Sequence, residues 1–155
     1  DCIYATGEDY ITPAADVIKS RGITDCKIYG SNISPSVCQL IMDGQVEACT
    51  GGEFVCGSLA VTLLINYLDG NPIKDADGTA PYFDNLTQFM VTAENAEDFY
   101  EFLSDENLAT HTISDEEYQN LLVRNNPDVV YDYFYDFLTN YEENVYAKVE
   151  ANAAQ

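Results

Sequence analysis

Apolar and polar stretches alternate regularly through the first 73 residues. Short apolar runs that suit strands are followed by polar breaks and then by segments with helical spacing of apolar positions. The predicted strands cover residues 2–6, 26–30 and 46–50, and the predicted helices end at Arg21, Gly44 and Gly70. Strands that alternate with helices of this length are typical of βαβ units. The pattern therefore predicts an α/β fold with a parallel sheet.

Three polar breaks follow the predicted strands, where parallel α/β sheets bind their ligands. The candidate site residues in these breaks are Gly7, Glu8, Asp9, Asn32, Gly52 and Glu53. Each type of residue also has a structural interpretation. Asparagine suits turns, acidic residues at the start of a helix interact favourably with its dipole, and glycine gives the backbone room.

The second half of the chain predicts one more strand and several helices. Residues 74–82 predict a loop, residues 86–91 a strand, and residues 93–103 a helix with Thr92 as its N-cap. This helix is expected to bury Phe99 and Leu103, with Phe102 as a further candidate. The segment from Ser114 to Glu117 predicts a capping box, and Asn126-Pro127 predicts the start of one last helix.

Pro13 limits where the first helix can begin. Proline is tolerated in the first turn of a helix, so the sequence predicts a start near Thr12, with that residue as the N-cap.

The tail over residues 92–155 is acidic and rich in aromatic residues. From Ala93 onward it carries 15 acidic and two basic residues, and its aromatic residues recur at helical spacing. This spacing indicates an amphipathic face that packs on residues 1–91. A docking surface for a partner, or an aromatic platform for a carbohydrate, is the alternative interpretation.

Charge excludes several classes of function. The chain has 27 acidic and 6 basic residues, a formal net charge of −21. Nucleic acids and anionic membrane surfaces require a basic footprint, so neither is an expected partner. No apolar run approaches the roughly 20 residues of a membrane span.

The chain shows no motif for a metal, a phosphate or a nucleophile. Its five cysteines have no metal-binding spacing, which favours buried free thiols, although a disulfide between neighbouring strands is an alternative. His111, the only histidine, has no partner at ligand spacing and is assigned no catalytic role. We therefore expect no cofactor and no metal.

Several short segments together resemble a known family. They are residues 1–5, the turn at 22–25, Ile28-Tyr29-Gly30, residues 42–48 and the helix end at 67–73. In these segments the chain resembles the C-terminal half of the type I periplasmic sugar-binding proteins, the ribose-binding-like solute receptors of ABC transporters. The strand at 86–91 is similar to the family's return strand.

The resemblance implies that residues 1–91 form part of one lobe of a two-lobed protein, and that the chain is a fragment. In the family, the helix corresponding to residues 54–70 belongs to the other lobe. The two lobes are joined by hinge strands and close over a sugar. The acidic tail lies outside the resemblance.

The resemblance also implies which positions contact the ligand. The family's three polar contacts correspond to Gly7, Asn32 and Gly52, and of these only Asn32 has a side chain that can bind a hydroxyl. Glu8 and Glu53 can substitute from the adjacent positions. Losing two of the three contacts argues against a standard pentose, because unpaired buried polar groups are costly.

The function implied is a non-enzymatic, extracytoplasmic solute-binding protein, periplasmic or lipid-anchored at the cell surface. Its expected partners are a small polar ligand, with a sugar as the leading class, and an ABC transporter permease. Exposed apolar faces on a fragment also favour self-association. Two alternatives are a ligand-sensing module of the same fold in a regulator or receptor, and an enzyme that uses Glu8 and Glu53 as a carboxylate pair.

Overall fold

The computed structural model describes residues 1–104 and 112–154, apart from the side chain of Phe54, and the chain forms two compact units. His111 lies outside the described residues. The first unit comprises Asp1–Gly51, Phe89–Ala109 and Tyr146–Gln155, and the second comprises Gly52–Gln88 and Thr110–Val145.

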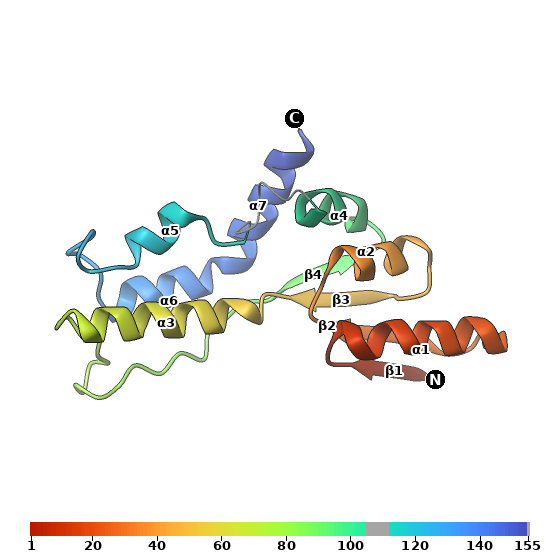
Figure 1. The fold of residues 1–155 in the computed structure, drawn as a ribbon, viewed down its shortest axis with the longest axis horizontal. Helices are drawn as coiled ribbons and strands as arrows, with labels where there is room; N and C mark the ends of the chain where they lie inside the picture. Colours follow the sequence, from red (N-terminus) through yellow and green to blue (C-terminus); the bar gives the residue numbers. More distant parts are fainter. Residues whose placement is uncertain (105–111, 155) are drawn as a thin grey trace. The chain divides into compact units, whose positions relative to one another are not determined.

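The first unit holds the sheet (Figure 1). Its elements are β1 (Cys2–Ala5), α1 (Glu8–Arg21), β2 (Lys27–Ser31), α2 (Pro35–Met42), β3 (Ala48–Gly51), β4 (Phe89–Thr92) and α4 (Ala96–Ser104). The second unit holds α3 (Phe54–Leu68), α5 (Asp115–Asn120) and α6 (Tyr131–Thr139), and α7 (Tyr141–Ala153) has residues in both units. No helix among the described residues has the length and apolar character that crossing a membrane requires.

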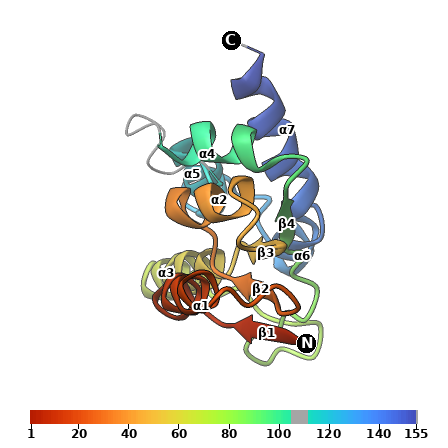
Figure 2. The same ribbon diagram turned by 90° about the vertical axis from the view of Figure 1, so that its right-hand side faces the viewer.

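The four strands lie in the order β1-β2-β3-β4. The first three strands are parallel, as the alternating pattern predicts, and β4 runs antiparallel to β3. Helices α1 and α2 contact each other on one side of the sheet (Figure 2). This placement is what two successive right-handed crossovers produce.

The two faces of the sheet differ in burial. In β2, Ile28 and Gly30 are buried beneath the helices, whereas Tyr29 is 41% exposed on the other face. Its register partner Tyr4 in β1 is 64% exposed. Sheets built from parallel strands are usually covered on both faces, so this pair of tyrosines marks an open face.

Aromatic side chains pack β4, α4 and the end of α7 together in the first unit. Phe89 in β4 and Phe99 in α4 are fully buried and stack with 5.2 Å between their ring centroids. Tyr146 packs edge-on against Phe99, and its hydroxyl group bonds the backbone of Met90 twice: it donates to the carbonyl oxygen at 3.0 Å and accepts from the N–H at 2.9 Å. At the outer edge of β4, both the N–H and the carbonyl group of Met90 are therefore hydrogen-bonded.

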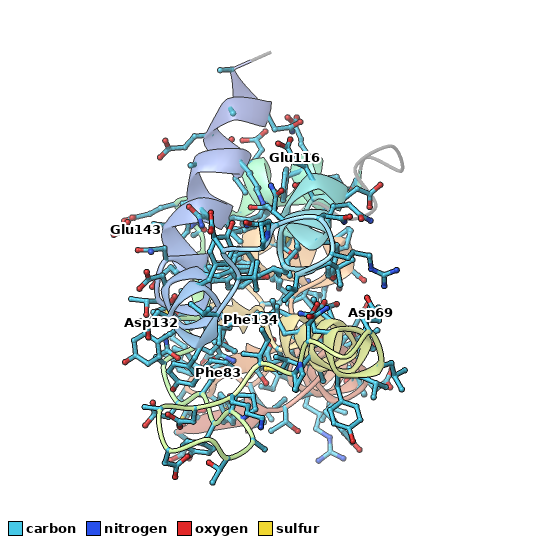
Figure 3. The ribbon with its side chains drawn as sticks, turned by 90° about the vertical axis from the view of Figure 1, so that its left-hand side faces the viewer. Asp69, Phe83, Glu116, Asp132, Phe134 and Glu143 are labelled. Carbon is cyan, nitrogen blue, oxygen red and sulfur yellow. The ribbon has the colours of Figure 1, made fainter. Side chains whose placement is uncertain are left out.

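The second unit has an aromatic interior and an acidic surface. Phe83 stacks on Tyr131 with 4.9 Å between centroids, and on the buried Phe134 with 6.0 Å. Figure 3 shows Phe83 and Phe134 toward the middle of this unit, with Asp132 and Glu143 at its periphery. In this unit the aromatic side chains that stack around the buried Phe134 thus contribute to the core.

A buried asparagine fixes α3 to the segment after α5. Asn66 is fully buried, its Nδ2 donates to the carbonyl oxygen of Leu121 at 3.0 Å, and its Oδ1 accepts from the N–H of Val123 at 3.0 Å. One turn further along, the Nε of Arg124 lies 2.9 Å from a carboxylate oxygen of Asp69.

Sequence expectations about α1 and α4 are wrong. Helix α1 begins at Glu8 rather than near Thr12, because the N–H groups of Tyr10 and Ile11 already bond the carbonyl oxygen of Gly7 and Ile11 is fully buried. Pro13 therefore lies inside the helix. In α4 the buried side chains are Phe99 and Phe102, and Leu103 is half-exposed.

The final helix is also two helices rather than one. Asn126 does not cap a helix but a turn, in which its side chain accepts from the N–H of Asp128. Helix α6 begins only at Tyr131, and Asn140 separates it from α7. The capping box at Ser114 is confirmed: its hydroxyl group accepts from the N–H of Glu117 at 3.2 Å, and the Glu117 side chain accepts from the N–H of Ser114 at 2.6 Å.

All five cysteines are free thiols, so the alternative of a disulfide between strands is wrong. Cys38 and Cys49 are buried, as expected for thiols that pack as small apolar groups. Cys2 and Cys56 are exposed, which the prediction of buried thiols did not anticipate.

We expect the chain to lose stability between pH 9 and pH 12. Burial raises the pKa of the Cys38 thiol from 9.0 to about 12. In this window the unfolded chain has already released the thiol proton while the folded chain still holds it, so the free energy of unfolding falls as pH rises. Urea unfolding at successive pH values measures the slope.

The matched variants for this pH experiment are Cys38→Ala and Cys56→Ala. Replacing the buried thiol should flatten the pH dependence, whereas replacing the exposed thiol should leave it unchanged. Tyr141 adds a smaller loss of stability at high pH, because burial raises the pKa of its hydroxyl group from 10.0 to about 12. If Cys38→Ala leaves the pH dependence of the free energy of unfolding unaltered, Cys38 is not its source.

Candidate functional site

The carboxyl ends of β1 and β2 lie side by side in the first unit. Ala5 and Gly30 are register partners at this edge. After β1 come Gly7 and the first turn of α1 with Glu8 and Asp9, and after β2 comes Asn32. The carboxylate of Glu8 accepts a hydrogen bond from the hydroxyl group of Ser36, at the start of α2. This hydrogen bond joins the N-terminal turns of α1 and α2.

Asn32 has the backbone conformation of a turn. Its φ of 72° lies in the left-handed region, which asparagine adopts more readily than other residues with a side chain. Its side chain is exposed, and no hydrogen bond to it is recorded within the described part of the chain. The residue therefore serves the turn through its backbone and leaves its amide available.

Gly7 and the acidic residues after it begin α1. Gly7 has a φ of 179°, which any residue adopts, and a Cβ at this position would make only an ordinary contact with Tyr10. The loop geometry therefore does not require glycine here. Glu8 and Asp9 lie in the first turn, where the helix dipole favours negative charge.

Sequence reasoning missed the role of Ser36. Ser34 caps α2 by accepting from the N–H of Val37 at 3.2 Å, and Ser36 lies 3.2 Å from the Ser34 hydroxyl group while it donates to Glu8. The pairing of Ser36 with Glu8 joins residues 28 positions apart, and no local pattern signals it.

A hollow of about 410 Å³ adjoins this pair. It lies among α1, α2 and α4, and its walls carry hydroxyl and amide groups together with apolar surface. The lining residues are Thr12, Pro35, Ser36, Gln39, Leu40 and Tyr100. Hydroxyl, amide and aromatic groups of this kind suit a small polar ligand.

The remaining two candidates, Gly52 and Glu53, begin the second unit. Gly52 has a φ of 115°, a conformation that side chains rarely allow, so here glycine is a structural requirement. Glu53 follows it at the N-cap position of α3. Neither oxygen of the Glu53 carboxylate is accessible to solvent, and neither has a hydrogen-bond partner among the residues described.

The surroundings of Glu53 include a buried tyrosine. Burial is the main cause that raises the pKa of the Tyr141 hydroxyl, a hydrogen bond with Thr112 acts against it, and the charge of Glu53 adds to the increase. A buried carboxylate without a donor is costly, and the N-terminus of α3 offsets only part of that cost. Among the described residues, Glu53 is therefore an acceptor without a donor.

Comparisons with known proteins bear on the fold. No protein-family model matches the chain, and no curated protein matches its sequence. Among solved structures, the periplasmic binding protein of the arabinose ABC transporter from Shewanella sp. ANA-3, bound to α- and β-L-arabinofuranose, is 23% identical with a TM-score of 0.54. The alignment covers 71% of this chain and 35% of that one. The chain shares part of its fold.

Two further structures support the same conclusion. A periplasmic sugar-binding protein from Pseudomonas fluorescens is 16% identical, with a TM-score of 0.59, and the match covers 84% of this chain and 39% of that one. A galactofuranose-binding protein is 17% identical, with a TM-score of 0.54 and coverages of 67% and 34%. The chain therefore spans between one third and two fifths of the length of these structures. The α/β fold with a mostly parallel sheet, and its likeness to periplasmic sugar-binding proteins, are confirmed.

Proposed function

We propose that the chain is part of an extracytoplasmic solute-binding protein that delivers a small polar ligand, with a sugar as the leading class, to an ABC transporter permease. The observation that carries the proposal is the shared fold with three proteins described as binding arabinofuranose, galactofuranose or sugar. Those proteins are binding proteins, and the proposed role is accordingly non-enzymatic, with hinge closure over the ligand.

In this proposal Asn32, Glu8 and Glu53 are the polar contacts. The exposed amide of Asn32 donates to and accepts from ligand hydroxyl groups, and the carboxylates of Glu8 and Glu53 accept from them. Asp9 lies beside Glu8 and adds a further acceptor. Gly7 and Gly52 leave room for the ligand at the positions where a larger polar side chain is usual.

Asn32→Gly is expected to weaken ligand binding about tenfold, which corresponds to about 1.4 kcal/mol. Glycine keeps the left-handed backbone that the turn needs and removes only the amide. Isothermal titration of the chain with L-arabinose and with D-galactose gives the two dissociation constants.

The control for this titration is Asn71→Gly, at an exposed asparagine in the loop after α3. This variant should bind as the unsubstituted chain does. Equal affinities for Asn32→Gly and the unsubstituted chain would remove Asn32 from the site. A chain that binds neither sugar, nor any other member of a carbohydrate panel, would overturn the proposed function itself.

A further inference from the structure

The carboxylate of Glu8 is held by a chain of hydroxyl groups at the start of α2. Ser36 donates a hydrogen bond to Oε1 of Glu8. The hydroxyl group of Ser36 lies 3.2 Å from that of Ser34, and the Ser34 hydroxyl group accepts from the N–H of Val37 at 3.2 Å. These groups connect the backbone of α2 to the first turn of α1.

The donors in this chain of hydrogen bonds all point toward Glu8. A serine hydroxyl group has a single hydrogen to donate, and Ser36 uses it on the carboxylate. The hydrogen between the two serines therefore belongs to Ser34, which donates to Ser36. Hydrogen bonds aligned in this way polarise one another, and this chain starts at the N-terminus of α2, where the helix dipole is positive. Aligned donors thus fix the position of the Glu8 carboxylate.

A carboxylate fixed in this way selects the group that it contacts. An ionised carboxylate only accepts hydrogen bonds, so a ligand group that bonds to Glu8 must be a donor, such as a sugar hydroxyl. A ligand carboxylate in the same place brings two negative charges together, which is unfavourable. Glu8 is half-buried whereas Asp9 is exposed, so salt in the solvent screens the charge of Glu8 less.

The basic residues of the first unit lie away from the ends of β1 and β2. Lys19 and Arg21 are in the last turn of α1, and Lys27 is the first residue of β2. Lys148 is on α7, which bonds β4, and β3 lies between β4 and β2. An anionic ligand at the ends of β1 and β2 therefore meets the charge of Glu8 without a compensating cation from the described part of this unit.

The hollow of about 410 Å³ beside Ser36 has the same preference for uncharged groups. Its lining side chains, at positions 12, 35, 36, 39, 40 and 100, carry hydroxyl, amide and apolar groups and no charge. A neutral ligand that bonds to Glu8 finds further hydroxyl and amide partners there, at Thr12 and Gln39.

We propose that Ser34 and Ser36 position Glu8 so that the ligand site selects neutral, hydroxyl-bearing ligands over their carboxylate counterparts. This selectivity rests on the proposed function, in which Glu8 contacts the ligand. Ser36 acts through Glu8 and is a positioning residue, whereas Glu8 determines the specificity.

D-galactose and D-galacturonate test the selectivity, because they differ only at C6, which is a hydroxymethyl group in one and a carboxylate in the other. Isothermal titration of the full chain should give galacturonate a dissociation constant at least about tenfold above that of galactose. Glu8→Gln keeps the size of the side chain and removes its charge, so it should bring the two constants within about threefold of each other. The matched control is Asp16→Asn, at an exposed carboxylate further along α1, which removes the same charge and should keep the difference.

The ratio of the two constants also tests the positioning role of Ser36. Ser36→Ala should lower the ratio toward that of Glu8→Gln, and Ser36→Thr, which keeps a hydroxyl group, should restore it. Ser36→Ala should have little further effect once Glu8 is glutamine, because the two residues act together. Ser20→Ala, at an exposed serine of α1, is the control and should leave the ratio unchanged.

Each part of the proposal has an outcome that overturns it. Equal constants for the two sugars overturn the selectivity, as does an equal fall of the ratio in Glu8→Gln and Asp16→Asn, while galactose binding leaves the proposed function standing. If Ser36→Ala weakens both sugars alike and keeps their ratio, Ser36 has a structural role only. A chain that binds neither sugar overturns the selectivity, and the carbohydrate panel then decides whether the proposed function falls with it.

Discussion

Asn66→Leu is expected to lower the free energy of unfolding by about 4 kcal/mol, because it leaves two buried backbone groups without partners. Leucine has the same branched arrangement of non-hydrogen atoms as asparagine, so the variant removes the hydrogen bonds without leaving a cavity. The carbonyl oxygen of Leu121 and the N–H of Val123 both depend on this side chain, at 3.0 Å each. Urea unfolding followed by circular dichroism measures the loss.

The control for Asn66→Leu is Asn71→Leu, five residues further along the chain. The side chain of Asn71 is exposed, with a single long contact of 3.4 Å to the carbonyl oxygen of Asp69. Its replacement should change stability by no more than about 0.5 kcal/mol. If the two variants lose the same amount, Asn66 does not fix α3 in the way described.

Gly51→Val is expected to destabilise the first unit by about 3 kcal/mol, because the core has no space for a side chain there. A Cβ at Gly51 would lie 2.5 Å from the Cγ2 of Ile33 and 2.5 Å from the ring of Phe89. Phe89 is fully buried and stacked on Phe99, so it cannot move aside without disturbing its neighbour. The thermal midpoint of the variant, with its urea unfolding curve, measures the effect.

Gly7→Ala is the control for Gly51→Val. A Cβ at Gly7 would meet only Tyr10, at an ordinary 3.9 Å, and the φ of 179° suits alanine. This variant should be as stable as the unsubstituted chain or slightly more so, because alanine loses less backbone entropy on folding. A Gly51→Val variant as stable as Gly7→Ala would contradict the packing of β3 against β4.

Local patterns in the sequence were enough to predict the elements of the first unit. The strands at β1, β2 and β3 and the helices between them follow from hydrophobic spacing, and Ser114 with Glu117 is a short-range capping signal. The start of α1 could not be predicted in this way. There the burial of Ile11 outweighs the penalty for Pro13 inside a helix.

The sequence was enough to place the segments after β1 and β2 at one edge of the sheet but not to predict their interactions, and their role as a ligand site stays a prediction. The loops after β1 and β2 meet because their strands are paired, and pairing of parallel strands is implied by the βαβ pattern. The bond from Ser36 to Glu8 and the buried state of the Glu53 carboxylate depend on residues far away in the sequence. Spacing within one segment carries no information about such contacts.

The hydroxyl group of Tyr146 has a consequence for how this sheet can grow. By bonding both the N–H and the carbonyl group of Met90, it occupies the outer edge of β4 where an added strand would have to bond. In the described residues β1 has no strand on its outer side. The sheet therefore has one edge blocked by a side chain, at β4, and one edge free to pair, at β1. A sheet with a single free edge can pair with one neighbouring strand from another chain, and no further chain can then be added. Fibres need two free edges on each sheet. Tyr146 therefore protects this chain against open-ended assembly through its strands.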